Sequence, residues 1–414
     1  MTKAKKLLLI EANTDGTIGG SHFCLLEIVQ RIDRNKYEPI VLFYERNSLE
    51  DTFRASCPVF IVPSAKPFNL SRHIPPWLNG INAIRFSLSI IQKLANFASI
   101  VIPGFFWAMA FIARSRIDIV HLNNCPDLSD WLIASKLLGV KCSAHLRGNW
   151  KPAPRSFQRW LVGHYDLIIA ISTSVKEFLE HEGIATNKIS VIHDGINLQP
   201  HVACLEQQVW PEMIGDSFAG FVIGVVGNIK PWKGQHVVVE AMHILTSARS
   251  DVKCLMVGDV GRLREDQEYF SALKANVREL GLERDIVFTG FRQDVLPLMK
   301  EFSVIVHSST EPEPLGRVIL EGMLMGRPVI ATAHGGPLEL IVDGESGFLV
   351  PPDNPAVLAA RLATLLDDED LRSRMGANAR RRVCECFGLD AKVGEIEDQL
   401  DELFSGNGSR NGLA

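Results

Sequence analysis

The clearest structural signal lies in residues 221–257, which read FVIGVVGNIKPWKGQHVVVEAMHILTSARSDVKCLMV. Apolar runs predict buried strands at 221–226 and 252–257, and apolar residues at helical spacing predict a helix at 235–246. Apolar strands that alternate with helices are typical of a parallel sheet covered on both faces. This segment therefore predicts an α/β fold.

The same alternation runs through the rest of the chain. It predicts earlier strands at 7–10, 39–44, 59–62, 117–122, 140–144 and 167–171, with helices that include 23–32, 128–138 and 174–181. It predicts later strands at 286–288, 303–307, 328–331 and 347–349, and a helix at 269–280. Two successive doubly wound domains are expected, with the carboxyl ends of their strands, and hence the ligand, at a shared cleft.

The expected domain limits follow from changes in composition. An N-terminal domain is expected at 1–198, with a hydrophobic insert at about 63–116, and a C-terminal domain at 217–386. Residues 199–216 are polar, include Pro200 and Pro211, and predict a linker. A C-terminal helix is expected at 387–404, and the Gly/Ser/Asn-rich residues 405–414 predict a disordered tail.

The overall composition narrows the class of protein. The chain has 414 residues, of which 46% are hydrophobic and 22% charged, which excludes a disordered or fibrous chain. A net charge of −5 lacks the basic excess of a dedicated nucleic-acid binder, so no nucleic-acid partner is expected. The eight cysteines are scattered without a CxxC pair, and the apolar run at 7–10 is too short for a signal peptide. These features predict a reduced, cytoplasmic protein without a metal site.

Residues 313–323, EPLGRVILEGM, carry two carboxylates eight positions apart. Pro314 suits the first turn of a helix, which would separate Glu313 from Glu321 by roughly 12 Å along its axis. An anion bound at the exposed N–H groups of the helix start would have one carboxylate on each side. A nucleoside diphosphate sugar has this layout, with Glu313 at the sugar, Glu321 at the ribose, and the diphosphate at the N–H groups of Gly316, Arg317 and Val318. The alternative is a solvated helix with an incidental glutamate at each end.

Two further loops point to the same ligand. The loop GNIKPWKGQ at 227–235 joins a predicted strand to a helix, and Lys233 at the expected helix start would hold phosphate together with backbone amides. The alternative for Lys233 is an exposed turn lysine. The loop TAHGGP at 332–337 follows another strand, and its paired glycines allow a ligand to approach the backbone closely.

With these motifs the second half resembles the retaining nucleotide-sugar glycosyltransferases of family 4, which have the GT-B fold. Glu313 and Glu321 match the E-x7-E motif of that family, Gly227 to Gly234 resembles its phosphate segment, and residues 326–355 are similar throughout. The first half matches more loosely, through the glycine loop at 19–21, Ser172 and residues 192–196. The resemblance implies two Rossmann-like domains facing a cleft.

The resemblance also implies roles for individual residues. The enzyme would transfer a sugar with retention of configuration, and Glu313 would orient that sugar. His145, in SAHLRGNW at 143–150, matches the first-domain histidine of the family and would form a hydrogen bond with the donor sugar near the reacting carbon; the alternative is a strand-end histidine with a local partner. Arg147 and His121 are weaker candidates. The remaining donor-binding residues would be Gly19, Gly20, Asn228, Lys233, Gly316, Arg317, Val318 and Glu321, and neither a metal nor a cofactor is expected.

Two positions depart from the family pattern. Asn228 stands where the family usually has arginine, and Asp194 stands where it usually has asparagine. The first change removes one phosphate cation, for which Lys230 or Arg317 would compensate. It motivates a second hypothesis, a nucleotide-sugar-binding protein without turnover. Another GT-B activity on nucleotide sugars, such as an epimerase, is a third.

The insert contains a twenty-residue stretch without a charge, LANFASIVIPGFFWAMAFIA at 94–113, which is long enough for a transmembrane helix. A single crossing would separate strands of one sheet, and Pro103-Gly104 predicts a break in the helix. Two interpretations remain, a buried helical pair and a monotopic hairpin that dips into a membrane. The hairpin predicts partly exposed apolar residues at 105–111, a lipid-linked acceptor, and a place at the inner face of the cytoplasmic membrane. Anionic headgroups would meet Arg72, Arg85, Lys93, Arg114 and Arg116.

Overall fold

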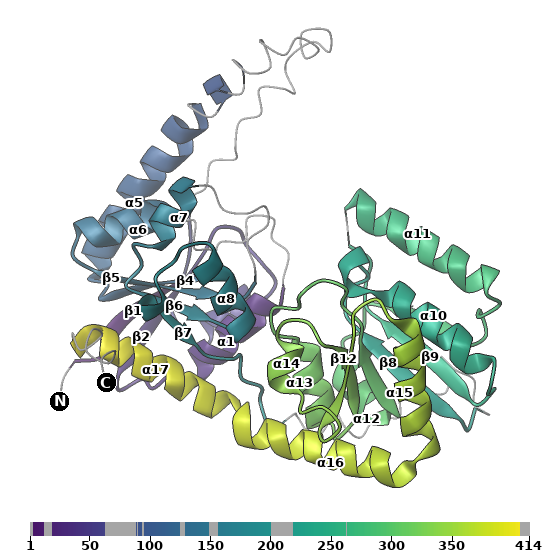
Figure 1. The fold of residues 1–414 in the computed structure, drawn as a ribbon. Coiled ribbons are helices and arrows are strands. Elements are labelled where there is room, and N and C mark those ends of the chain that lie inside the picture. The colour runs from purple at the N-terminus through teal and green to yellow at the C-terminus, as the bar shows by residue number, and fades with distance from the viewer. Residues whose placement is uncertain are drawn as a thin grey trace. The chain divides into compact units, whose positions relative to one another are not determined.

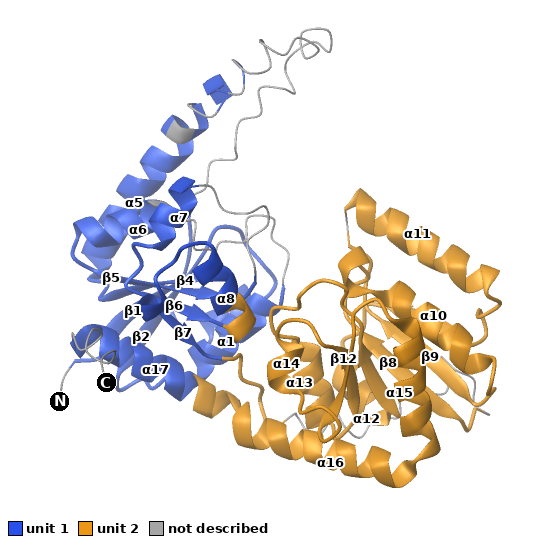
Figure 2. Ribbon diagram, in the orientation of Figure 1, with its two compact units in different colours: residues 1–170, 176–192, 393–414 blue, residues 171–175, 193–392 orange. Residues whose placement is uncertain are grey.

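The chain divides into two compact units, which Figure 2 distinguishes by colour. The structure, a computed structural model, describes residues 3–11, 19–62, 88, 90–92, 95–124, 129–148, 156–199, 218–261 and 263–405. Unit 1 comprises residues 1–170, 176–192 and 393–414, and unit 2 comprises residues 171–175 and 193–392. The expected linker and tail lie outside the described residues, apart from Gln199 and Ser405, and stay predictions.

Unit 1 is built on a parallel sheet of seven strands in the order β3-β2-β1-β4-β5-β6-β7 (Figure 1). All four residues of the apolar run at 7–10 are buried, so both faces of β1 are covered. The strands are β1 Lys5–Glu11, β2 Tyr37–Phe43, β3 Val59–Ile61, β4 Ile119–Asn123, β5 Lys141–Leu146, β6 Leu167–Ala170 and β7 Ile189–Val191. The helices are α1 Gly20–Arg31, α2 Glu50–Arg54, η2 Phe97–Val101, α5 Ile102–Ser115, α6 Ser129–Leu137, α7 Ser156–Val162, α8 Thr173–His181 and η3 Thr186–Lys188.

Unit 2 has a parallel sheet of six strands in the order β10-β9-β8-β11-β12-β13. Helix α10 packs against α11 and α15, while α13 packs against α12, α14 and α16, which gives a helical layer on each side of the sheet (Figure 1). The strands are β8 Phe221–Val226, β9 Val252–Val257, β10 Ile286–Gly290, β11 Val304–His307, β12 Val329–Thr332 and β13 Gly347–Val350. The helices are η5 Pro231–Lys233, α10 Gln235–Thr246, α11 Arg264–Glu279, α12 Val295–Glu301, α13 Arg317–Leu324, α14 Pro337–Leu340, α15 Pro355–Asp367 and α16 Glu369–Cys386.

The two sheets confirm the predicted α/β class with two doubly wound domains. In both sheets the first strand lies between the second and the fourth, so the connections leave in opposite directions at that point. Ligands of such sheets bind outside the carboxyl ends of the strands at this switch in direction. The expected cleft shared by the domains stays a prediction.

Helix α5 has one packed face and one exposed face. Ala108 and Ile112 are buried, Trp107 meets Trp131 of α6 edge to face, and Phe106 is 64% exposed. Residues 98–115 form a helix long and apolar enough to cross a membrane, and only 11% of it is buried. The prediction of partly exposed apolar residues at 105–111 is confirmed. The predicted break at Pro103-Gly104 is wrong, because π-helix η2 runs directly into α5 without an interruption.

The position of α5 in the chain argues against a single crossing. Strand β1 pairs with β2 on one side and with β4 on the other. Helix α5 lies between β3 and β4 in the chain, so one crossing would place strands of one sheet on opposite sides of a bilayer.

Helix α17, Leu389–Ser405, begins in unit 2 and continues in unit 1. Its apolar residues Val393, Ile396 and Leu400 are buried. Asp401 accepts a hydrogen bond of 2.7 Å from the hydroxyl of Tyr37. These contacts make the C-terminal helix part of the N-terminal unit.

Truncation of the buried Leu400 side chain tests this attachment. Leu400→Ala should lower the free energy of unfolding by about 2–5 kcal/mol, because a 1% exposed leucine leaves a cavity. Urea denaturation followed by circular dichroism measures the change. The control is Glu402→Ala at an exposed position of the same helix, and equal stabilities of the two variants would contradict the packing.

Candidate functional site

Three loops of unit 2 meet at the carboxyl edge of its sheet. Strands β8, β11 and β12 are successive neighbours. Their following loops are 227–230, 308–316 and 333–336. The loops after β8 and β11 flank the switch in direction, where ligands of such sheets bind.

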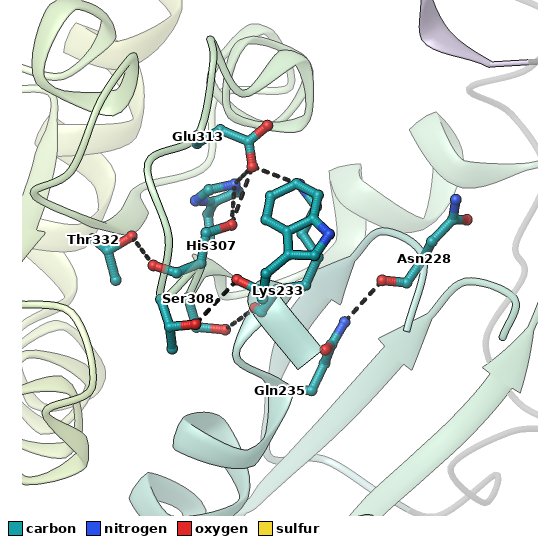
Figure 3. A network of polar contacts seen from close by, with 10 residues as sticks. Asn228, Lys233, Gln235, His307, Ser308, Glu313 and Thr332 are labelled. Carbon is teal, nitrogen blue, oxygen red and sulfur yellow. Dashed lines mark hydrogen bonds and ion pairs between the residues drawn. The ribbon is translucent and has the colours of Figure 1, made fainter. Parts of the chain in front are cut away.

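Glu313 lies at the centre of this edge and is 8% exposed. Its Oε2 accepts from Lys233 Nζ at 2.5 Å, His307 Nε2 at 2.9 Å and Ser309 Oγ at 3.1 Å (Figure 3). Among the described residues Oε1 has no hydrogen-bond partner, and in Figure 3 it points away from the three donors. One carboxylate oxygen is therefore held by the protein, and the other is left to accept a hydrogen bond from a ligand.

Glu313 remains ionised despite its burial. Burial alone would raise the pKa of the carboxyl group, but the hydrogen bond and charge of His307 and the charge of Lys233 outweigh it. Together they hold the pKa of Glu313 well below its usual range. An ionised carboxylate only accepts hydrogen bonds, so Glu313 suits the recognition of hydroxyl groups and not proton donation.

Lys233 is positioned by its neighbours. Its Nζ lies 4.1 Å from the centroid of the Trp232 ring, and its carbonyl accepts from Ser308 Oγ at 3.0 Å. The predicted place at a helix start is wrong in detail, because Lys233 ends the 3-10 turn η5 and α10 begins at Gln235. Gly234 between them has φ +67 and packs on Ser308, where a Cβ would lie 2.0 Å from the carbonyl oxygen.

The expected helix around the two glutamates begins later than predicted. Gly316, with φ +96, precedes the first helical residue Arg317, so Glu313 and Pro314 lie in the loop before α13. Within α13 the guanidinium of Arg317 donates from Nε to Glu321 Oε1 at 3.1 Å. The N–H groups of Arg317 and Val318 lie in the first turn, where a helix offers its amides to an anion. Gly316, Arg317, Val318 and Glu321 therefore share one helix start, and Glu313 does not lie on that helix.

The paired glycines after β12 have a role that the sequence did not reveal. The N–H of Gly336 donates to the Glu313 carbonyl at 2.8 Å. A Cβ would lie 2.4 Å from that carbonyl oxygen at Gly335 and 2.4 Å from the Leu315 Cα at Gly336. The close approach that the glycines allow is therefore to the backbone that carries Glu313.

Asn228 lies at the exposed end of β8. Its carbonyl accepts from Gln235 Nε2 at 3.1 Å, and in Figure 3 its side-chain amide points away from Gln235. The amide is neutral, so the structure places no cation at the position where the family usually has arginine.

In unit 1 the predicted residues occupy the corresponding edge of the other sheet. Gly19 and Gly20 lie at the start of α1, and a Cβ added to either would meet no described atom within 4 Å. His145, at the end of β5, is 1% exposed, and its Nε2 has no hydrogen-bond partner among the described residues. Burial, then Arg147 and His121, lower the pKa of His145 well below its usual value, so the imidazole is neutral.

Sequence reasoning missed several partners at both edges. In unit 2 it missed His307 and Ser309, which hold Glu313. In unit 1 it missed Glu11 and Asn123, both buried at strand ends. These residues could have been found from the sequence, because each is a polar residue at or just after the end of an apolar strand. Among the described residues no group of three or more His, Cys, Asp or Glu side chains is arranged to hold a metal ion, and the absence of a cofactor stays a prediction.

Comparison with known families identifies the class of protein. Residues 218–382 match the family model "Glycosyl transferases group 1", and residues 18–200 match "Glycosyltransferase Family 4". The two matches correspond to the C-terminal and N-terminal halves with the motifs described above. Together the two models match both halves of the chain, which is similar to these glycosyltransferases over most of its length and shares the fold of the solved structures it resembles.

Individual relatives are more distant. The chain is 30% identical over 247 residues to the capsular polysaccharide biosynthesis glycosyltransferase CapM of Staphylococcus aureus, a match that covers 57% of this chain and 62% of CapM. It is 28% identical to the N-acetyl-alpha-D-glucosaminyl L-malate synthase of Bacillus anthracis, with 82% of this chain and 87% of that protein covered. The crystal structure of Anabaena Alr3699/HepE in complex with UDP-glucose has the same fold, with a TM-score of 0.73, 24% identity, and coverage of 96% of this chain and 99% of that one.

Replacement of Glu313 by Gln tests the charge balance of the site. A carboxyl group with a depressed folded-state pKa stabilises the fold above its ordinary pKa of 4.5, and this contribution is lost as the pH falls. Between about pH 5 and pH 3 the free energy of unfolding should therefore fall more steeply for the wild type than for Glu313→Gln. Urea titrations across this range measure both slopes. Glu283→Gln, which removes an exposed carboxyl group of unit 2, should keep the wild-type slope, and a wild-type slope for Glu313→Gln would contradict the assignment.

Proposed function

We propose that the chain is a retaining hexosyltransferase that moves a sugar from a nucleoside diphosphate sugar to an acceptor. The observation that carries the proposal is the buried, ionised Glu313 with one oxygen held by Lys233, His307 and Ser309. This arrangement lies beside the start of α13, within the segment that matches the group 1 transferases. The UDP-glucose complex of the similarly folded HepE adds support for a nucleotide sugar as the donor.

In the proposed mechanism the donor binds at the carboxyl edge of the unit 2 sheet. Lys233 and the first-turn N–H groups of Arg317 and Val318 neutralise the departing diphosphate. Glu313 Oε1 accepts from a hydroxyl of the transferred sugar, and Glu321 accepts from the ribose. His145 of unit 1 donates its Nε2–H to the sugar near the reacting carbon. Exclusion of water from the site limits hydrolysis of the donor.

Binding of the donor is the first step to test. A thermal-shift screen of UDP-, GDP- and ADP-sugars should reveal one that raises the melting temperature, because a ligand of the folded state adds about 2.7 kcal/mol at 100 times its Kd. Glu321→Ala should abolish the shift of that donor. Glu268→Ala is a matched control, because it breaks an equivalent i,i+4 pair with Arg264 on the exposed face of α11 and should keep the shift. A shift that persists in Glu321→Ala would show that the ribose assignment is wrong.

Turnover separates the proposal from its two alternatives. A labelled donor should yield a glycoside with the anomeric configuration of the donor, read by NMR. Release of an epimerised nucleotide sugar would favour an epimerase. Binding without a product would favour a protein without turnover, the alternative that the neutral Asn228 motivates.

We further propose that the acceptor is lipid-linked and that α5 contacts the inner face of the cytoplasmic membrane. The support is the exposed apolar face with Ile102 and Phe106, followed by Arg114 and Arg116 for anionic headgroups. The name of CapM, a capsular polysaccharide biosynthesis glycosyltransferase, favours a saccharide acceptor, whereas the name of the N-acetyl-alpha-D-glucosaminyl L-malate synthase favours a small one. None of the six described cysteines forms a disulfide bond with another described residue.

A charge placed on the apolar face of α5 tests the membrane contact. Phe106→Glu should weaken co-sedimentation with phosphatidylglycerol-containing vesicles, because a carboxylate would have to enter the apolar part of the interface. Phe291→Glu makes the same change at a 69% exposed phenylalanine of unit 2 and should bind as the wild type does. Unchanged binding of Phe106→Glu, or no binding by the wild type, would remove the membrane proposal and leave a soluble acceptor.

A further inference from the structure

A row of three buried polar residues crosses the sheet of unit 1 at its carboxyl edge. Glu11, Asn123 and His145 are direct neighbours in register on β1, β4 and β5. They are 2%, 0% and 1% exposed, so none of them exchanges its hydrogen bonds with bulk water. The row spans the switch in direction between β1 and β4, where a ligand of such a sheet binds.

The hydrogen bonds along the row all run from donor to acceptor in a fixed order. Asn123 Nδ2 donates to Glu11 Oε2 and also to the Ser21 carbonyl at 3.3 Å. Arg147 Nε donates to Asn123 Oδ1 at 3.1 Å, and Arg147 Nη2 donates to His145 Nδ1 at 3.3 Å. A carboxylate only accepts and a guanidinium only donates, so a single orientation of the Asn123 amide satisfies both neighbours.

The direction of these bonds determines the tautomer of His145. Because Arg147 can only donate, His145 Nδ1 must accept, and the neutral imidazole carries its proton on Nε2. This Nε2 is buried and has no partner among the described residues. A buried N–H without a partner is costly, and a hydrogen bond donated to an oxygen of a ligand would remove that cost.

We propose that Glu11 is a positioning residue for glycosyl transfer, which acts through Asn123 and Arg147 to make His145 present its Nε2–H to the donor sugar. This inference rests on the proposed function. Glu11 itself need not touch the substrate. Its part is to hold the nitrogen of the Asn123 amide, which leaves the oxygen of that amide for Arg147.

Protonation of Glu11 should weaken this arrangement. Burial raises the pKa of Glu11 to about 7, although Asn123, Arg147 and Ser21 each lower it. Among the described residues, the titratable groups on neighbouring elements are Arg147 after β5, His121 on β4 and His22 on α1. The pKa of His121 is lowered by burial to about 3. A protonated carboxyl group also donates, so it can hold the amide oxygen of Asn123 and turn the amide nitrogen toward the donor Arg147. The rate of transfer should therefore fall as the pH drops through about 7.

The kinetic test compares Glu11→Gln with a buried glutamate outside the row. Glu11→Gln should lower kcat by roughly 10- to 100-fold, the loss seen when partners that orient metal-binding histidines are removed, with little change in the KM for the donor. It should also remove the limb near pH 7 from the profile of kcat against pH. Glu397→Gln changes an 8% exposed glutamate of α17 in the same unit and should keep the limb. A Glu11→Gln variant with wild-type kcat and pH profile would overturn the proposal.

A second measurement does not depend on activity. Long-range ¹H–¹⁵N NMR spectra, with the His145 signal assigned by its loss in His145→Ala, should show the Nε2–H tautomer in the wild type. Glu11→Gln and Asn123→Ala should both shift the signal toward a mixture of tautomers. An unchanged signal in both folded variants would overturn the proposal. If the wild type transfers no sugar but the tautomer responds to Glu11, the proposed function fails and the positioning by Glu11 stands.

Discussion

The buried negative charge of Glu313 is the constraint on which the edge of unit 2 depends. A carboxylate taken out of water is stable only with charged or hydrogen-bonding partners. Those partners come from different places in the chain, with Lys233 after β8, His307 at the end of β11, and Ser309 in the loop that follows β11. The backbone of Gly335 and Gly336 after β12 then holds the Glu313 loop in place. One charge thus ties together the loops of three neighbouring strands.

The same organisation occurs in unit 1, with different residues. There the carboxyl edge carries Glu11, Asn123 and His145, which are joined through Arg147. In each unit the first and fourth strands of the sheet lie side by side, so the loops that leave them diverge and expose the strand ends. The strands themselves are apolar because both of their faces are covered. The polar groups therefore lie at the ends of the strands. The two edges differ in charge, since Glu313 is held ionised and the imidazole of His145 is held neutral.

Local patterns predicted the regular elements well. Strands β8 and β9 and helix α10 have the predicted bounds, because apolar runs and helical spacing are local properties. The start of α13 differs from the prediction, because Pro314 predicts a first helical turn, whereas the left-handed Gly316 ends the loop and α13 begins at Arg317. The continuity of η2 and α5 also differs from the prediction, since Pro103-Gly104 predicts a break and the π-helix passes directly into the α-helix there. Both errors lie at a glycine or proline, where the local backbone conformation outweighs the pattern.

The sequence by itself determined the α/β class, the two-domain plan and the candidate site residues, among them Glu313, Lys233 and His145. The order and spacing of apolar and polar residues are local properties of the sequence, and they are sufficient for these conclusions. Only the tertiary structure decided which partners those residues have. Lys233 and Glu313 are 80 positions apart, and Glu11 and Asn123 are 112 apart, yet each pair is hydrogen-bonded. The physical reason is that parallel strands bring together residues from distant crossovers, and the register between strands is set by packing of the whole sheet.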